Sequence, residues 1–225
     1  IIQDYVGLFQ KPKLPPRYAF GIWVSANHWN CEADVDRLLA ELEEYRFPAS
    51  VIVLEAWSDE ATFYIWNGAE YKPEKSKEGF SYEDFDFRNS PYWKDPKGMI
   101  ERLHEKGKKL VLWQIPVFKG MEPDRTSEQL DLDKEYAIEH GLAVLNKDGT
   151  PYEIPEGNWF EGSYIPDFTN EKTREFWFRK RQYLTDMGVD GFKTDGGEFI
   201  YSRDVTFSDG TDGEEGKNQY CQDYI

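Results

Sequence analysis

The segment that most constrains the fold is residues 188–198, which read GVDGFKTDGGE. Its middle, residues 191–194, predicts a short buried strand that delivers the carboxylate of Asp195 into a glycine-rich turn. A helix-like run, residues 169–187, comes directly before it. The acid could simply start a turn, because Asp is common in turns before glycine. It could equally stand at the end of a barrel strand, where catalytic groups are placed.

The alternation of strand and helix recurs along the chain. Strands are expected at residues 18–24, 51–54, 109–113 and 191–194, and helices at 31–46, 95–106, near 127–140 and at 169–187. A hairpin-type turn is expected at 147–150, and no full helix is expected after the last strand. This order predicts an α/β fold, a (β/α)8 barrel of which only about the first half is present. The expected organisation is a lead-in segment at 1–17 and a partial barrel domain at 18–225, with long insertions at 56–92 and 116–168.

Composition excludes several classes of partner. The 225 residues include 27 Lys and Arg against 43 Asp and Glu, a net charge of −16. We therefore expect no nucleic-acid or anionic-membrane partner, because phosphate binding needs a basic face. No apolar run approaches the length of a membrane span. Two cysteines are too few for a disulfide framework and favour a cytoplasmic location.

Aromatic and charged side chains gather after the four predicted strands. In chain order they are His28, Trp29, Glu55, Trp57, Trp113, Lys193 and Asp195. Because the carboxyl ends of barrel strands meet at one opening, we expect these side chains to lie together. Carboxylates and lysine hydrogen-bond to hydroxyl groups, and aromatic rings can stack on sugar rings. The set predicts a site for a neutral, polyhydroxylated ligand.

Each of these residues also has a structural interpretation. Trp57 and Trp113 could be core aromatics, and a lone His28 near a loop could be a structural hydrogen-bonding group. Lys193 is expected to pair with Asp195 and keep it ionised. The acidic run at 209–215 lacks the register of a calcium-binding loop, so we expect a flexible acidic loop and no metal there.

Six segments in order resemble glycoside hydrolase family 31, the α-glucosidase and α-xylosidase family. They are residues 15–21 (PPRYAFG), 51–57 (VIVLEAW), 96–100 (PKGMI), 110–114 (LVLWQ), 165–170 (IPDFTN) and 188–198 (GVDGFKTDGGE). The resemblance covers nearly the whole chain. It implies a retaining glycosidase that removes a terminal α-linked sugar through a covalent glycosyl-enzyme intermediate, with no metal or organic cofactor. The expected substrate is an oligosaccharide or another α-glycoside.

The resemblance also implies roles for individual residues. Asp195 matches the family's nucleophile, and Lys193 and Trp113 match positions that line the sugar site. Glu55 stands where the family usually has Asp, which moves the carboxylate by about one C–C bond length, ~1.5 Å. Gly196-Gly197 replaces a common Phe-Gly pair and is expected to widen the pocket.

A retaining enzyme needs a second carboxylic acid, which the family carries in a later W-x-G-D run. This chain has no such run, so we expect that acid beyond Ile225, in the remainder of the same polypeptide, and an inactive fragment. Two rival functions remain open at this point. One is a non-catalytic carbohydrate-binding barrel, and the other is a Schiff-base lyase using Lys193, which Asp195 disfavours by holding the lysine charged.

Overall fold

The computed structural model describes residues 2–7, 13–122 and 125–224. The helices are α1 (Ile2–Val6), α2 (Glu32–Glu44), α3 (Pro96–Glu105), α4 (Glu128–Glu139), α5 (Glu171–Asp186) and α6 (Gly213–Tyr224), with 3-10 turns η1 (Arg17–Phe20) and η2 (Tyr82–Asp84). The strands are β1 (Ile22–Ala26), β2 (Ala49–Leu54), β3 (Lys109–Gln114), β4 (Leu145–Asn146), β5 (Gly191–Thr194) and β6 (Val205–Thr206).

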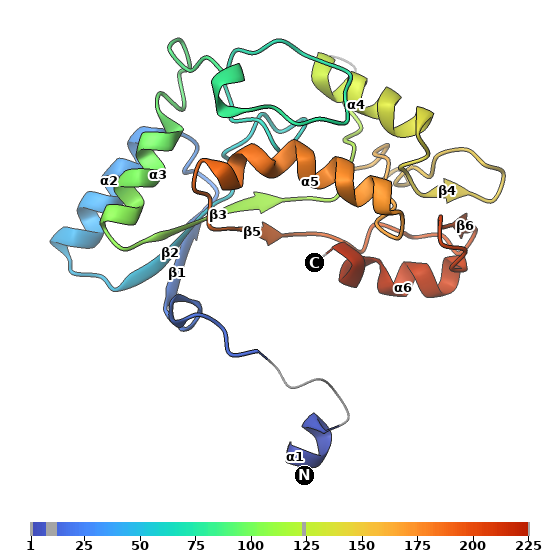
Figure 1. Ribbon diagram of the computed structural model, residues 1–225, viewed down its shortest axis with the longest axis horizontal. Coiled ribbons are helices and arrows are strands. Elements are labelled where there is room, and N and C mark those ends of the chain that lie inside the picture. Colours follow the sequence, from blue (N-terminus) through green and yellow to red (C-terminus); the bar gives the residue numbers. More distant parts are fainter. Residues whose placement is uncertain (1, 8–12, 123–124, 225) are drawn as a thin grey trace.

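The centre of the described structure is a four-stranded sheet in the order β1-β2-β3-β5, with every neighbouring pair parallel. Helices α2, α3 and α5 connect or precede these strands and lie along one side of the sheet (Figure 1). Parallel strands need such crossover connections. A tight turn reverses the direction of the chain and can therefore join only antiparallel strands. The observed order confirms the predicted α/β class.

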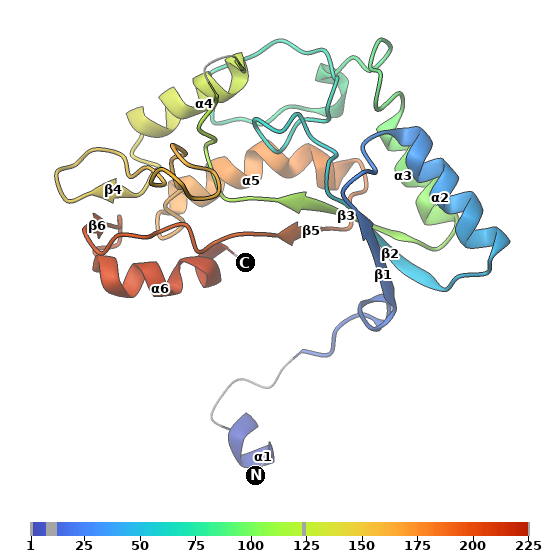
Figure 2. The same cartoon turned by 180° about the vertical axis from the view of Figure 1, so that it is seen from behind.

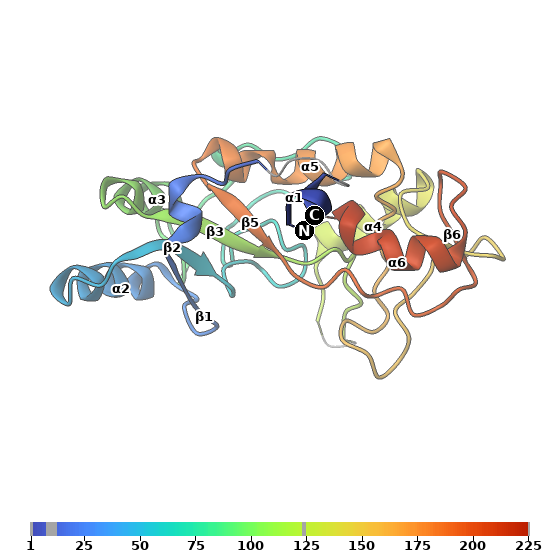
Figure 3. The ribbon, with the colours of Figure 1, turned by 90° about the horizontal axis from the view of Figure 1, so that it is seen from below.

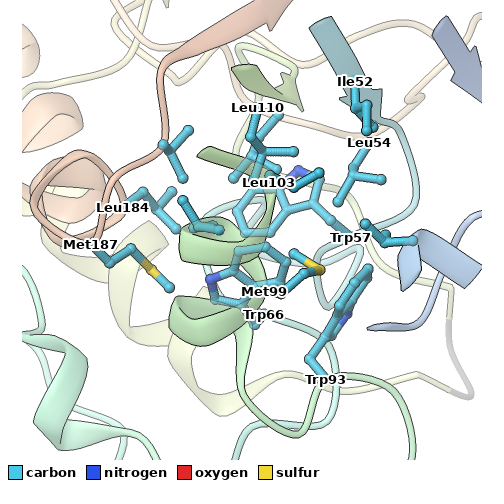
Figure 4. Close-up of a cluster of buried hydrophobic side chains, with 14 of the residues drawn as sticks. Ile52, Leu54, Trp57, Trp66, Trp93, Met99, Leu103, Leu110, Leu184 and Met187 are labelled. Carbon is cyan, nitrogen blue, oxygen red and sulfur yellow. The ribbon is translucent and has the colours of Figure 1, made fainter. Parts of the chain in front are cut away.

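The helix-facing side of the sheet carries the main core. Ile52 and Leu54 of β2 and Leu110 of β3 are fully buried there. Figure 4 shows Leu103 of α3 and Leu184 of α5 gathered against them. Burying one such side chain stabilises a fold by about 1.5–3 kcal/mol, so this layer fixes how the helices sit on the sheet.

The opposite side of the sheet is the inner face. Val51, Val53 and Val111 form a small buried cluster with Tyr18. Side chains alternate between the two faces of a strand, so the odd-numbered residues of β2, β3 and β5 share this inner face. The register supports this, since Val53 pairs with Val111 and Trp113 pairs with Lys193. The inner-face series therefore runs on toward Glu55, Trp113 and Asp195 at the strands' carboxyl ends.

Local chemistry explains where the helices begin. Asp95 caps α3 by accepting a 3.0 Å hydrogen bond from the Gly98 amide, and Pro96 occupies the first turn, where no amide donor is needed. After the helix, Gly107 adopts a φ of 66°, a conformation that favours glycine.

The start of the chain differs from the expectation of an extended lead-in and a strand at 18–24. Residues 2–6 form the short helix α1, which stands apart from the sheet in Figure 1. Residues 8–12, within the predicted lead-in, lie outside the described residues. Residues 17–20 form η1, because Pro16 precedes them in an extended conformation and the Gly21 amide closes the turn onto the Tyr18 carbonyl. The first strand consequently begins at Ile22.

The end of the chain also differs from expectation. Asp212 accepts hydrogen bonds from the amides of Glu214 and Glu215 and so starts α6 inside the acidic run. A full helix therefore follows β5, where none was expected, and residues 213–215 of the acidic run belong to this helix rather than to a loop. Figure 3 shows α6 near the end of β5.

The segment between β3 and α5 builds a second core beside the sheet. It contains α4 and β4, and β4 pairs antiparallel with β6 (Figure 2). The expected turn at 147–150 is present, since the Asn146 amide bonds to the Thr150 carbonyl and Gly149 has a φ of 86°. Ile115, Tyr152 and Phe199 are buried in this second core, which supports the carboxyl ends of β3 and β5.

Candidate active site

A pocket of about 500 Å³ lies at the carboxyl ends of the parallel strands. Four residues singled out from the sequence line it together: Glu55, Trp113, Lys193 and Asp195. They come from, or directly follow, β2, β3 and β5, and all belong to the inner-face series of odd-numbered residues. The alternation of side chains along the strands thus explains why they meet.

The carboxylate of Asp195 is held by one donor on each oxygen. Trp113 donates from its indole Nε1 to Oδ2 at 2.7 Å, and the Gly196 amide donates to Oδ1 at 3.0 Å. The Asp195 amide bonds to the Gln114 carbonyl at 2.9 Å, which extends the pairing of β3 and β5 by one residue. The acid is therefore fixed in orientation at the pocket wall, and each oxygen keeps acceptor capacity toward a ligand.

The turn after Asp195 needs glycine at position 196. Gly196 has a φ of 73°, and a Cβ there would come 2.4 Å from the Phe199 ring. The ring of Phe199 occupies the space that a side chain at 196 would need. No extra space opens beside Gly196 itself, and a wider pocket next to the nucleophile stays a prediction.

Lys193 pairs with Glu55, not with Asp195 as expected. Its Nζ lies 3.0 and 3.2 Å from the two carboxylate oxygens of Glu55, and Ser25 Oγ donates to Glu55 Oε1 at 2.5 Å. Residues two apart on a strand are separated by almost 7 Å, so the long lysine side chain instead reaches across β3 to the end of β2. The Glu55 side chain is 13% exposed and the Lys193 side chain 43% exposed, which leaves the lysine open to a ligand.

Trp57 does not line the pocket, so its predicted contact with substrate is corrected. Its side chain is fully buried between the sheet and Trp66, because the chain bends after Leu54 and strand alternation ends there. Its Nε1 donates a 2.9 Å hydrogen bond to the Trp113 carbonyl. Trp57 thus supports Trp113 from the core side.

His28 and Trp29, also predicted to contact the ligand, do not line this pocket. His28 is exposed, and its ring meets the edge of Trp29, which packs half-buried against the main core. Asn27 lines the pocket instead. Asn27 continues the inner-face alternation of β1, in which Ser25 pairs with Val53, so this signal was available in the sequence.

Several pocket residues carried no sequence signal that pointed to a site. They are Ser58, Glu60, Phe63, Lys119, Trp159 and Phe160, all from the insertions. Glu60 and Phe63 have φ values of 54° and 58°, a conformation that non-glycine residues rarely adopt and that clusters at functional sites. Asp59 sustains this loop by accepting hydrogen bonds from the amides of Ala61, Thr62 and Phe63.

No group of three or more His, Cys, Asp or Glu side chains among the described residues could hold a metal ion. Within the same ranges no helix is both long and apolar enough to cross a bilayer.

Comparison with known proteins identifies the family. Residues 12–223 match the model of the TIM-barrel domain of glycosyl hydrolases family 31. The chain belongs to this family. Its four parallel strands are therefore part of a (β/α)8 barrel, which confirms the predicted fold.

Individual relatives in the family are similar over all or most of the chain. It is 43% identical to an isomaltosyltransferase of Sporosarcina globispora, covering 100% of this chain and 20% of the relative. It is 39% identical to a 1,3-alpha-isomaltosidase of Kribbella flavida, covering 93% of this chain and 28% of the relative. The chain thus spans less than a third of the length of these relatives.

Solved family 31 structures superpose closely. A cycloalternan-forming enzyme from Listeria monocytogenes, in complex with a pentasaccharide substrate, has a TM-score of 0.93 at 44% identity, covering 100% of this chain and 21% of that one. A cycloalternan-degrading enzyme from Trueperella pyogenes, in complex with a covalent intermediate, has a TM-score of 0.92 at 37% identity, covering 99% and 30%.

Proposed function

We propose that this chain is part of the catalytic barrel of a retaining enzyme that cleaves α-linked glycosides, with Asp195 as the nucleophile. The observation that carries the proposal is the placement of Asp195. Its carboxylate is oriented by Trp113 and Gly196 on the wall of a pocket that also presents Glu55 and Lys193. The covalent intermediate described for the Trueperella enzyme supports the same class of mechanism.

The proposed reaction has two steps. An Asp195 oxygen attacks C1 of the bound sugar, the bond from C1 to the leaving oxygen breaks, and a carboxylic acid gives that oxygen its proton. In the second step the oxygen of water, or of a sugar hydroxyl, attacks C1, the ester bond to Asp195 breaks, and the proton returns to the second carboxylate. We propose that this second carboxylate lies outside the present chain, in keeping with the share of the relatives that the chain spans.

Glu55 and Lys193 are proposed to bind hydroxyl groups of the sugar in the pocket. Their ion pair places an acceptor and a donor side by side, with Ser25 holding the carboxylate from the β1 side. This pairing also disfavours a Schiff-base function for Lys193, because its Nζ is already held by both carboxylate oxygens of Glu55, at 3.0 and 3.2 Å.

The test is Asp195→Ala in the full-length protein, assayed on aryl α-glycosides. We expect kcat to fall by at least about a thousandfold, as for removal of other catalytic nucleophiles. Added azide should restore turnover and give the β-glycosyl azide, because a small anion can enter the space of the missing carboxylate. Near-normal turnover of the variant would defeat the assignment. Sugar binding without turnover in the unaltered protein would instead favour a non-catalytic carbohydrate-binding barrel.

A further inference from the structure

A groove of about 950 Å³ opens beside the pocket. Three residues line both cavities: Lys119, Trp159 and Phe160. Every residue that lines the groove lies between positions 119 and 162, within the insertion that follows β3. The groove is therefore continuous with the pocket, and the insertion rather than the strands of the barrel forms it.

Trp159 stands at the junction of the two cavities. The residue is 53% exposed, although its ring centroid lies only 4.9 Å from that of Phe160 and 5.8 Å from that of Phe199. Tryptophan is usually largely buried, so a half-exposed indole on the rim of a concave surface indicates a binding role. The ring is also 6.3 Å from that of Trp113, which holds Asp195.

The loop that carries Trp159 is tightly hydrogen-bonded. The Gly157 amide donates to Glu161 Oε2 at 2.7 Å, and the Gly162 amide donates to the Ile154 carbonyl at 2.8 Å. Phe160 has a φ of 61° and turns its ring toward Phe63 and Phe199. A ring held in place before the ligand arrives loses little entropy on binding.

The groove's charge narrows the choice of ligand. Its charged lining residues are two lysines and four glutamates: Lys119, Lys134, Glu122, Glu153, Glu156 and Glu161. The excess of carboxylates disfavours phosphate or another anion. Carboxylates accept hydrogen bonds from hydroxyl groups, and the lysines can donate to them. Together with the exposed indole, this lining suits a neutral sugar chain.

We propose that the groove binds the sugar units that adjoin the one in the pocket, with Trp159 as their stacking platform. The protein then prefers an α-linked oligosaccharide to a short glycoside. The proposal rests on the proposed function in one respect, namely that the pocket holds a sugar. It assigns Trp159 as a specificity-determining residue.

The test measures binding without turnover. Calorimetry on the full-length Asp195→Ala protein would use isomalto- and malto-oligosaccharides of two to five units. We expect affinity to rise about tenfold from the shortest to the longest member of the better-bound series, the effect of one aromatic contact surface. In the Asp195→Ala protein, a second substitution Trp159→Ala should remove this rise of affinity with length. Trp159→Phe in the same background should keep most of it.

Tyr45→Ala provides the matched control, because Tyr45 is an exposed aromatic at the end of α2, away from the groove. The proposal is overturned if affinity does not depend on length, or if the rise survives in the Trp159→Ala variant. A variant that retains disaccharide binding is folded, so loss of the rise alone is informative. If the Asp195→Ala protein still turns over substrate, the assignment of the nucleophile fails. The role of the groove is then decided separately, by how kcat/KM depends on oligosaccharide length in the Trp159 variants.

Discussion

Gln114 joins the end of β3 to the loop that forms one wall of the pocket, by a 2.7 Å hydrogen bond from its Nε2 to the carbonyl of Phe63. The same Nε2 also donates to the Trp113 carbonyl at 3.0 Å. On the other side, Arg181 of α5 donates from Nε to Gln114 Oε1. Both side chains are buried, so this chain of contacts links a covering helix to the residues around Asp195.

Gln114→Leu should therefore disturb the site without altering any residue that lines the pocket. It leaves the Phe63 carbonyl and Arg181 without these partners, and each unpaired buried group costs about 1–3 kcal/mol. We expect kcat on aryl α-glycosides to fall about tenfold or more, with a smaller change in KM, because the orientation of Trp113 and Asp195 is affected. The exposed Gln182→Leu on α5 is the control. Equal kinetics for the two variants would contradict this positioning role.

Substitution of Trp113 should mainly affect catalysis, whereas substitution of Trp57 should mainly affect stability. Trp113→Phe removes the donor to Asp195 Oδ2, and a hydrogen bond to a charged group contributes about 1.5–3 kcal/mol, so kcat should fall about 10- to 100-fold. Trp57→Phe removes a buried donor to the Trp113 carbonyl and should mainly lower the midpoint of thermal unfolding. Kinetics and thermal unfolding of both variants check the order, and a larger kcat loss in Trp57→Phe would reverse our interpretation.

Substitutions at Glu55 should change both the KM for the sugar and the preference among different sugars. Glu55→Gln removes the charge opposite Lys193, so KM for an aryl α-glycoside should rise about tenfold, the equivalent of one lost charge-assisted contact. Glu55→Asp shortens the side chain by about 1.5 Å and should alter the ranking of gluco-, xylo- and galactosides by kcat/KM. The exposed Glu44→Asp on α2 is the control. An unchanged ranking in Glu55→Asp would remove Glu55 from the specificity argument.

Asp190 should make the fold sensitive to acid. Partial burial raises the pKa of Asp190, but hydrogen bonds from Lys109 at 2.7 Å, the Leu110 amide at 2.9 Å and His104 at 2.8 Å together hold it below its ordinary value. A carboxyl whose pKa is lowered by folding stabilises the fold above its unfolded pKa, near 4, and loses this contribution as the pH falls through the lowered native pKa.

Asp190→Asn should accordingly lower the free energy of unfolding at pH 7 by roughly 1 kcal/mol, a value reduced by solvent screening. The difference from the unaltered protein should shrink as the pH falls below about 4. Urea unfolding across this pH range, with Glu44→Gln as control, measures it. A difference that stays constant with pH would rule out the carboxylate's charge as the cause.

Replacing only one member of the buried pair of Lys180 and Asp133 should destabilise the fold strongly. Lys180 is fully buried and its Nζ lies 3.2 Å from Asp133 Oδ1. Burial raises the pKa of Asp133, although the charge of Lys180 partly offsets this. Lys180→Met leaves the carboxylate without its cation and should cost about 3–5 kcal/mol of stability. The double variant with Asp133→Asn should recover much of that loss in denaturant unfolding, and no recovery would point to packing instead of charge.

The alternation of strand and helix, and the position of Asp195 at the end of a strand, could be predicted because both depend on local rules. Apolar runs such as residues 51–54 and 109–113 favour strands wherever they are covered on both faces, and caps such as Asp95 mark helix starts. The odd-numbered series through Val53 and Glu55 follows from the alternation of side chains alone. These features need no information from distant residues.

The wrong prediction for Trp57 has a simple cause, which is that alternation stops where a strand ends. After Leu54 the chain bends, and Trp57 turns into the core. Local periodicity gives no rule for the direction of a side chain in an irregular segment. The miss at His28 is of another kind, because the alternation of β1 continues one residue past Ala26 and places Asn27 in the pocket.

What the sequence by itself determined is the order of parallel strands, the face that each strand residue occupies, and the acid at the end of β5. Only the tertiary structure decided that Lys193 pairs with Glu55, 138 positions away, and that Trp159 joins the pocket to the groove. The physical reason is that periodicity is set by the geometry of the backbone, whereas a side chain's partner is set by which strands and insertions pack beside it.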